Sequence, residues 1–530
     1  MHDSDLQDAG FIGPAFTWCN NQAGGRRIWE RLDRVLFNST ALVQIPGLQV
    51  AHLARIGSDH CPLLSGSDIF KSQGGIKFED VWLSYEEAAE IVQTMWRYPV
   101  RGNPPSVLSK KSARTLKALK KWSKKEVGDL LAKTKDLDQT ILSLQSKEAA
   151  SLLQLVANYN TTMARAETWW WQRAKTQWLT KGDRNTSFFH RVAIGKKRQN
   201  WIHAIVDASG HRTTKEIDIF GTMMEFFTSK WGIEDTINDF PSDLQPRATL
   251  SPLASAQLIR EVTREEIRAA VFSLANNKAP GVDGVTGSFL KGYWAIVERE
   301  VVDAVLHTFS TGFMPQTWKD TLVALVPKTS NAEQPKQFRP ISLCTTVYKV
   351  IAKVLVHRLK EHILSLVSLE QGAFVPGRFI ADNCILAQEI MHRLMTTKSR
   401  DGYMIVKVDL EQAYDRISWD YLDAVLNWFG FPNQWRRWVN MCIRGPRYAL
   451  LINGKKSPWI RASRGLRQGC PLSPYLFILS SELLSTMVHR EMHKGMLSGI
   501  KITPLFPLLF ATSSRRMLVD FYIICNIDLV

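Results

Sequence analysis

Apolar and polar positions change their spacing twice along this chain of 530 residues. Up to about residue 67, short apolar and aromatic runs such as 16–18 and 28–37 alternate with turn residues, which predicts strands. From about 84 to 198, apolar residues recur at three-, four- and seven-residue multiples with lysines between them, which predicts long helices, including a helical hairpin. The residues that set this period are Leu116, Leu119, Leu130, Leu137, Leu144, Leu152 and Val156.

A new pattern begins near residue 251. Residues 241–252 are rich in Pro, Ser, Asp and Gln, as expected of a loop between domains. Ser251 is a candidate helix N-cap, and Thr263 with Glu266 forms a candidate capping box. Helix and strand patterns then alternate, which predicts an α/β or α+β domain.

One apolar run in this second half ends in an acid. Residues 403–408 are mostly apolar, Asp409 follows them, and Tyr414 comes five residues later. Polymerases hold two Mg²⁺ ions about 4 Å apart with carboxylates of this kind, and an aromatic ring can face the incoming sugar. A second block, 464–474, contains Gln468 and Gly469, and a glycine suits a place where the backbone must approach another group closely.

Composition limits the class of protein. Length and a hydrophobic content of 45% predict several globular cores, and the net charge of +17 favours a polyanionic partner. A merely basic soluble protein is the alternative. The seven cysteines form no C-x-x-C pair, and no segment has the roughly 20 apolar residues of a membrane span or a signal-peptide pattern. We therefore expect an intracellular protein without a membrane partner, and nucleus and cytoplasm are not distinguished.

The blocks of the second half occur in a recognisable order. Together they resemble the fingers and palm of a reverse transcriptase, an RNA-directed DNA polymerase and nucleotidyltransferase, of the LINE-type (non-LTR) retrotransposons of the plant kind. The segments that carry this resemblance are 276–284, 325–328, 337–343, 370–378, 403–419 and 464–474.

The resemblance implies roles for individual residues. Lys328 and Arg339 would bind the triphosphate, where a cation and a planar fork of donors neutralise charge. Asp409 would hold Mg²⁺, and the Leu410 carbonyl would add an oxygen. Tyr414 would be a steric gate against a 2′-hydroxyl. A separate set is expected to act around these: Gln468 and Gly469 would lie beside the template–nucleotide pair, and Asp415 and Trp419 would cap and pack the next helix.

The chain departs from this pattern at residue 512. Thr512 and Ser513 stand where the family has two aspartates, and hydroxyl groups cannot bridge two divalent ions at neutral pH. We therefore expect an inactive polymerase without a thumb and an aberrant tail at 512–530. Asp520, in the run 518–524, is the alternative acid considered for a hairpin near Asp409, although one carboxylate would replace two.

The N-terminal segment has a resemblance of its own. An aromatic-Thr-Trp run, an Arg-Leu-Asp run and a Ser-Asp-His-x-Pro turn occur in that order, as in the C-terminal part of the endonuclease/exonuclease/phosphatase family. By this resemblance His60 would bind a phosphate, Asp33 would orient the His60 ring, and Asp59 would serve metal or nucleophile chemistry. The family's other metal ligands have no counterpart here, so this segment is interpreted as an inactive nuclease remnant.

A run of tryptophans and basic residues lies between these regions, at 169–198. Such a run can stack on bases and pair with phosphates, or it can be an amphipathic helix with tryptophans in the core and a solvated basic face. Both interpretations stay open.

The sequence as a whole predicts an α+β protein of four segments. These are a partial α/β nuclease sandwich (1–68), a basic, mainly helical linker (69–250), reverse transcriptase fingers and palm (251–511) and the tail (512–530). An RNA template and a DNA primer are the expected partners, bound by a basic surface. The alternatives to an enzyme are a non-catalytic nucleic-acid-binding remnant and a translated fragment without function.

Overall fold

The fold was determined from a computed structural model of the chain. The structure describes residues 6–11, 14–22, 24–38, 41, 48–52, 58–67, 75–127, 130, 133–134, 136–137, 139–140, 149–174, 195–196, 199–232, 240–241, 243–329, 332–369, 371–396, 402–409, 412–496, 500–503, 506–508, 510–515 and 518–527. For residues 402–409, 500–503, 506–508, 510–515 and 518–527 it describes the backbone.

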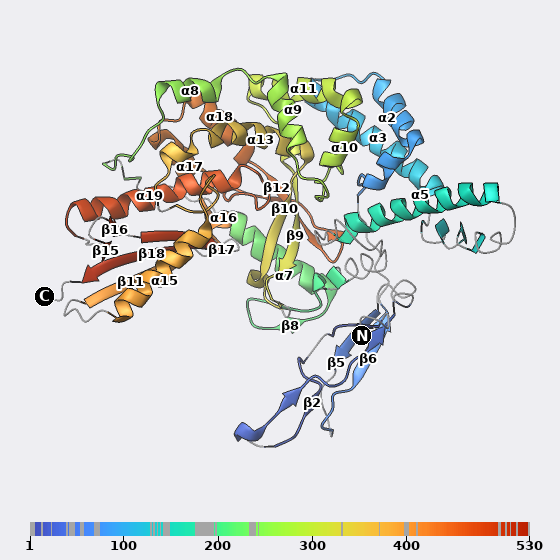
Figure 1. Ribbon diagram of the computed structural model, residues 1–530, viewed down its shortest axis with the longest axis horizontal. Helices are drawn as coiled ribbons and strands as arrows, with labels where there is room; N and C mark the ends of the chain where they lie inside the picture. Colours follow the sequence, from blue (N-terminus) through green and yellow to red (C-terminus); the bar gives the residue numbers. More distant parts are fainter. Residues whose placement is uncertain are drawn as a thin grey trace.

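The N-terminal segment consists of short antiparallel strand pairs, as predicted. They are β1 (Gln7–Asp8) with β4 (Leu36–Phe37), β2 (Trp18–Cys19) with β3 (Trp29–Glu30), and β5 (Leu48–His52) with β6 (Leu63–Ser67). The expected strand at 28–37 is thus divided between β3 and β4. Figure 1 shows these strands (dark blue) hanging below the rest of the molecule.

Helices follow, as the spacing of the leucines predicts. η3 (Asp80–Ser84) leads into α2 (Glu86–Arg97), which packs on α3 (Pro104–Glu126), and α5 (Ala149–Ala174) crosses η3. The Asn103 side chain accepts a hydrogen bond from the Ser106 N–H and so begins α3, with proline in the first turn. One face of α3 buries Leu108, Leu116 and Leu119. This face packs against α2 and against α11 (Trp294–Thr311).

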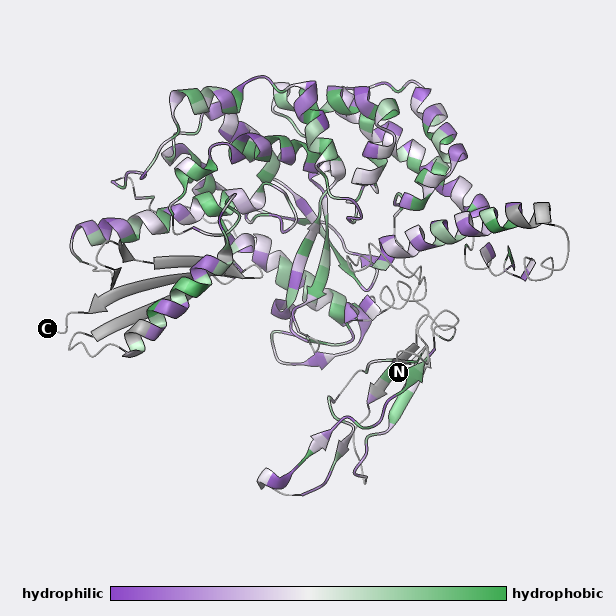
Figure 2. Ribbon diagram, viewed as in Figure 1, coloured by the Kyte–Doolittle hydropathy of each residue, from purple (hydrophilic) through white to green (hydrophobic). Residues whose placement is uncertain are grey.

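A central sheet carries the predicted fingers and palm. Its strand order is β10 (Phe338–Leu343), β9 (Thr321–Pro327), β12 (Arg447–Ile452) and β13 (Lys455–Lys456), with β14 (Ile460–Arg461) also paired to β12. β9 is antiparallel to β10 and parallel to β12. β9, β10 and β12 are largely hydrophobic (Figure 2), as expected of strands under a helical layer.

That layer lies above the sheet in Figure 1. Its members include α8 (Pro252–Ile259), α9 (Arg264–Phe272), α10 (Gly287–Gly292), α11, α12 (Gln316–Lys319), α13 (Thr346–Lys360), α14 (Ile363–Leu366), α17 (Trp419–Trp428), α18 (Asn433–Ile443) and α19 (Ser473–His493). The predicted N-cap at Ser251 and the predicted capping box of Thr263 and Glu266 are both confirmed.

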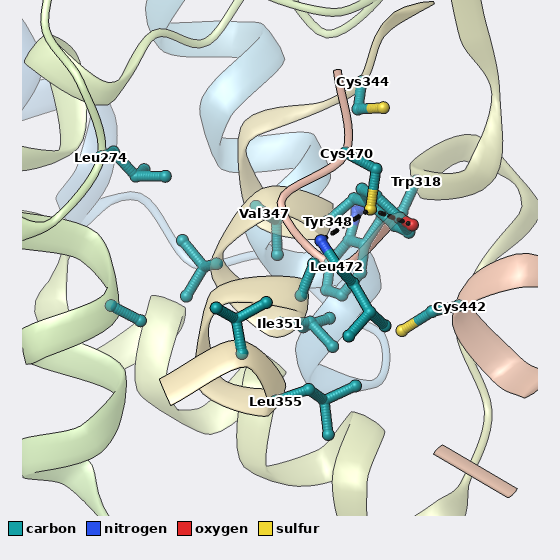
Figure 3. Packing of buried hydrophobic residues seen from close by; sticks show 14 of the residues in the cluster. Leu274, Trp318, Cys344, Val347, Tyr348, Ile351, Leu355, Cys442, Cys470 and Leu472 are labelled. Atoms are coloured by element: carbon teal, nitrogen blue, oxygen red, sulfur yellow. Dashed lines mark hydrogen bonds between the residues drawn. The ribbon is translucent and has the colours of Figure 1, made fainter. Parts of the chain in front are cut away.

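The core between sheet and helices is continuous and includes three thiols. Figure 3 shows Tyr348 and its neighbours on α13 packed against Trp318 and Leu472, with Cys344, Cys442 and Cys470 around them. Cys470 is 5% exposed, so the expectation that it is a small core residue is confirmed. Its sulfur lies 3.1 Å from the Tyr348 hydroxyl.

A second sheet contains the strand that ends in acid. Its order is β11 (Gly402–Asp409), β18 (Leu518–Ile527) and β17 (Phe510–Arg515), and all neighbours are antiparallel. β15 (Ile500–Thr503) and β16 (Phe506–Leu508) form a separate pair, and α15 (Ile380–Thr396) packs near β17. Residues assigned to the tail therefore lie between and beside palm strands, although the domain limits themselves stay a prediction.

The end of the predicted linker is packed onto the central sheet. β7 (Ile205–Val206) and β8 (Arg212–Thr213) form a hairpin, and α7 (Glu216–Gly232) contacts β14 and α16 (Ala413–Arg416). The Asn453 side chain joins the backbone of Ile202 by two hydrogen bonds of 2.8 Å, and Arg212 forms an ion pair with Glu333. Among the described helices, none is both long enough and apolar enough to span a bilayer.

Candidate nucleotide-binding and catalytic site

The acid at the end of β11 has another acid as its neighbour on the next strand. In the pairing of β11 with β18, Asp409 lies opposite Asp520, and Asp520 lies opposite Ser513 of β17. Directly opposed residues of an antiparallel pair share one face of the sheet. Asp520 therefore occupies the register position beside Asp409, which the sequence had offered as the alternative to the missing aspartate pair. Leu410 lies outside the described residues.

Tyr414 is held as a packed ring. It lies in the short helix α16. This helix begins directly after Gln412, whose backbone is left-handed with a φ of 56°. The Tyr414 ring stacks on Phe477 of α19 with centroids 5.0 Å apart and planes 12° apart. The side chain is 8% exposed, and burial raises the pKa of the Tyr414 hydroxyl. Such a ring has little freedom to turn, as a steric gate requires.

Asp415 binds a lysine from the linker instead of capping a helix. Its Oδ2 lies 2.7 Å from Nζ of Lys230 on α7, and both side chains are under 10% exposed. Trp231 Nε1 donates to the other oxygen of Asp415 at 3.4 Å. The N-cap of α17 is Ser418, which accepts from the Tyr421 N–H, so the prediction that Asp415 caps this helix is wrong. Trp419 is 7% exposed and does pack, as predicted.

The charge on Lys230 depends on this contact. Burial lowers the pKa of Lys230, while Asp415 acts in the opposite direction. The positive charges of Lys328 and Arg416 also lower the pKa of Lys230, so these cations lie within electrostatic reach of one another. Lys230 could not be identified from the sequence, because it lies 185 positions from Asp415 and outside every polymerase block.

Gln468 and Gly469 both lie against the backbone of Ser342 on β10. Gln468 Nε2 donates to Asp415 Oδ2 at 3.3 Å, and the Ser342 N–H donates to the Gln468 carbonyl at 2.8 Å. Gly469 has φ +129°, and a Cβ there would come within 2.6 Å of the Ser342 carbonyl oxygen. The glycine is thus required by its approach to β10, a reason the sequence did not reveal.

Lys328 and Arg339 lie on neighbouring strands of the central sheet. Lys328 directly follows β9, and its Nζ donates to the Lys336 carbonyl at 2.9 Å. Arg339 lies on β10 opposite Val326 and is half-buried. No acid among the described residues pairs with either side chain, so both cations keep charge available for a phosphate.

Arg467, the residue before Gln468, is a core cation. It is 4% exposed, and its guanidinium carbon lies 4.2 Å from the centre of the Tyr348 ring. This position in the core separates Arg467 from Lys328 and Arg339, which are exposed or half-buried.

The N-terminal residues singled out by the sequence meet at one turn. His60 Nδ1 lies 2.7 Å from Asp33 Oδ2, and the Asp33 N–H donates to Thr17 Oγ1 at 2.9 Å. Asp59 accepts a hydrogen bond from Trp18 Nε1 at 3.1 Å. The structure therefore brings Asp33 and His60 together, while Asp59 faces Trp18.

This contact predicts a shifted titration. The hydrogen bond to Asp33 raises the pKa of His60, and the same bond lowers the pKa of Asp33. Because the folded pKa of His60 is raised, the pair contributes fully to stability below the unfolded pKa of histidine, as long as Asp33 stays ionised, and this contribution is lost as the pH rises through the folded pKa. We expect Asp33→Asn to bring the His60 pKa back toward about 6.5. Proton NMR titration of His60 measures this, and an unchanged pKa would contradict the pairing.

The tryptophan-rich run is partly structural. Trp169 Nε1 donates to Glu79 at 2.8 Å, and the Arg173 guanidinium lies 3.4 Å from the centre of the Trp169 ring and 3.4 Å from Glu79. A base cannot stack on the ring face that Arg173 covers. For these two residues the amphipathic-helix interpretation holds, and residues 175–194 lie outside the described part.

Comparison with known proteins agrees with this arrangement. Residues 326–503 match the family model described as reverse transcriptase (RNA-dependent DNA polymerase). A transposon TX1 149 kDa protein of Xenopus laevis is 26% identical over 321 residues, which cover 60% of this chain and 24% of that protein. A Pol polyprotein from a type-1 retrotransposable element R2 of Nasonia vitripennis is 27% identical over 221 residues, covering 42% and 20%.

A shorter match is more similar. An uncharacterized mitochondrial protein of Arabidopsis thaliana is 50% identical over 72 residues, 12% of this chain and 59% of that protein. The chain thus carries a reverse transcriptase domain with an α+β fold. The relatives are proteins of a transposon and of a retrotransposable element, in agreement with a retrotransposon-derived domain. The chain spans about a quarter or less of the length of the TX1 and R2 proteins.

Proposed function

We propose that this chain binds an RNA template with a DNA primer and holds an incoming nucleotide beside α16. The observation that carries this proposal is the reverse transcriptase match over 326–503, because the segment includes the residues proposed to bind the nucleotide, from Lys328 to Gly469. Lys328 and Arg339 would bind the triphosphate. Tyr414 would face the sugar, and Gln468 and Gly469 would lie beside the nucleotide pair.

Magnesium is the proposed metal. Asp409 would hold it with the Leu410 carbonyl, and Asp520 is the acid in register with Asp409. No cluster of three or more metal-ligating side chains occurs among the residues whose side chains the structure describes. Bound Mg²⁺ would neutralise the triphosphate and activate the primer hydroxyl.

We propose further that the chain does not synthesise DNA, because Thr512 and Ser513 stand where the family has its pair of aspartates. Nucleic-acid binding without chemistry is then its function, and a fragment without function is the alternative. Residues 1–68 are proposed to be a nuclease remnant without activity, in which Asp33, Asp59 and His60 are the remaining residues of the phosphate site. The domain is proposed to be of the LINE type of the plant kind, and a match of 50% identity over 72 residues to an Arabidopsis thaliana protein supports the plant kind.

Nucleotide binding tests the proposed site. With a template–primer hybrid and Mg²⁺, Arg339→Gln is expected to weaken binding of a fluorescently labelled dNTP about 10- to 100-fold. A charge-assisted hydrogen bond contributes about 1.5–3 kcal/mol, which corresponds to this range. Fluorescence anisotropy measures the affinity, and Arg437→Gln, an exposed arginine on α18, is the matched control. Equal affinity in both variants would argue against Arg339 as a phosphate ligand.

A further inference from the structure

The basic residues of α3 divide into two groups by what they contact. Several are used inside the protein: Lys111 pairs with Glu300 at 2.5 Å, Lys120 pairs with Glu79 at 3.3 Å, and Arg114 donates to the carbonyls of Met95 and Tyr98. These side chains fix α3 to its neighbours. Their charge is not available to another molecule.

Lys117, Lys121 and Lys124 form the second group. All three are exposed, and none has an acid partner among the described residues. They follow one another at spacings of four and three, which places them on one face of the helix. The opposite face buries Leu108, Leu116 and Leu119. We name the three exposed residues the α3 lysine face.

The arrangement costs stability unless a partner binds. Like charges at these spacings repel one another along a helix, and no described acid compensates them. The three lysines span about 10 Å at 1.5 Å per residue. That length matches about three phosphates of one strand at about 3.4 Å rise per nucleotide.

We propose that the α3 lysine face binds the sugar–phosphate backbone of the nucleic acid outside the polymerase site. Figure 1 shows α3 on the flank of the helical layer opposite to β11 and α16, so the contact extends the bound nucleic acid beyond the nucleotide site. Lysines present charge without reading base edges, so the contact is independent of sequence. The inference rests on the proposed nucleic-acid-binding function and assigns part of it to the linker.

The location changes how the linker works. The covered ring of Trp169 cannot accept a base on that face, whereas the α3 lysine face is open to solvent. We therefore expect the linker to bind through the charge of the α3 lysine face, without a base stacked on the ring face of Trp169 that Arg173 covers. Such binding must weaken steeply as salt rises, because each neutralised phosphate releases counterions.

Salt-dependent anisotropy with a labelled RNA/DNA hybrid between 50 and 250 mM KCl tests the proposal. The full chain is compared with a triple variant, K117Q/K121Q/K124Q. Loss of three phosphate contacts is expected to make the slope of log K against log salt shallower by about 2 to 3. Changing the same three lysines to arginine keeps the charge and is expected to keep the slope.

The matched control is K215Q/R268Q/R437Q, which takes away three exposed charges, one directly before α7, one on α9 and one on α18. It lowers the net charge equally and is expected to leave the slope near that of the unchanged chain. Equal slopes for the α3 and control variants would overturn the inference. Failure of the unchanged chain to bind the hybrid at any salt would instead overturn the proposed function. A melting curve of each variant tests whether the fold is retained; among the changed side chains, Arg268 contacts the Phe272 ring at 5.2 Å.

Discussion

Lys230→Met is expected to lower the free energy of unfolding of the polymerase region by about 3–5 kcal/mol. The substitution leaves the carboxylate of Asp415 buried without its cation, since both side chains of the pair are under 10% exposed. Gln468 and Trp231 still donate to Asp415, but at 3.3 and 3.4 Å they are neutral and weaker donors. The variant is also expected to loosen α7 from α16.

Urea unfolding followed by tryptophan fluorescence measures the loss, and hydrogen exchange locates it. The amides that should exchange faster are those of Ser463 and Gly465, which donate to Trp231 and Ile417. The control is Lys455→Met, which removes the exposed pair of Lys455 with Glu216, whose side chains are 51% and 48% exposed. That change should cost at most about 1 kcal/mol. Similar losses in the two variants would contradict a buried role for Lys230.

The double variant K230M/D415L sharpens the test. Removing both charges together leaves no buried ion, so part of the lost stability should return. If the double variant is less stable than Lys230→Met alone, the Asp415 carboxylate contributes through Gln468 and Trp231 and not mainly through Lys230.

Local signals in the sequence were reliable. The caps at Ser251 and Thr263 involve residues within three positions of each other, so their geometry follows from the local pattern. The leucine spacing likewise predicted α3, because a period near 3.6 identifies the buried face of a helix without knowledge of its partner. The short N-terminal strands were likewise predicted from a local pattern, in which short apolar and aromatic runs alternate with turn residues.

Contacts between distant segments were not predictable. Asp415 has the residue type and position of a cap, but a buried lysine from α7 binds it and Ser418 takes the cap. Gly469 was expected to approach a nucleotide pair, and the structure shows that Ser342 also forbids a side chain there. In both cases the deciding atom belongs to a strand or helix far away in the sequence.

The pairing of β11 with β18 bears on catalysis. Thr512 and Ser513 stand where the family has its two aspartates, and β18 lies between their strand, β17, and β11. Thr512 and Ser513 are thus one strand further from Asp409. The residue opposite Asp409 is an acid, Asp520, but one carboxylate would still replace two.

Primer extension on poly(rA)/oligo(dT) with Mg²⁺ or Mn²⁺ is expected to show no incorporation above background. A two-metal site contributes several orders of magnitude to the rate, and Thr512 and Ser513 cannot bridge the ions. The variants to compare are Asp409→Asn and Asp520→Asn. Asp420→Asn, an exposed acid on α17 that pairs with Arg444, is the control.

The pairing of Asp409 with Asp520 gives the primer-extension assay a second interpretable outcome. Incorporation by the unchanged chain that is lost in Asp409→Asn and Asp520→Asn, but kept in Asp420→Asn, would contradict the proposed inactivity. It would also identify the β11–β18 pair as the ion-binding site, because opposed positions share one face of the sheet. Incorporation that survives Asp520→Asn would instead require a carboxylate from elsewhere. The assay thus tests whether Asp409 and Asp520, the opposed residues of β11 and β18, hold the metal ions.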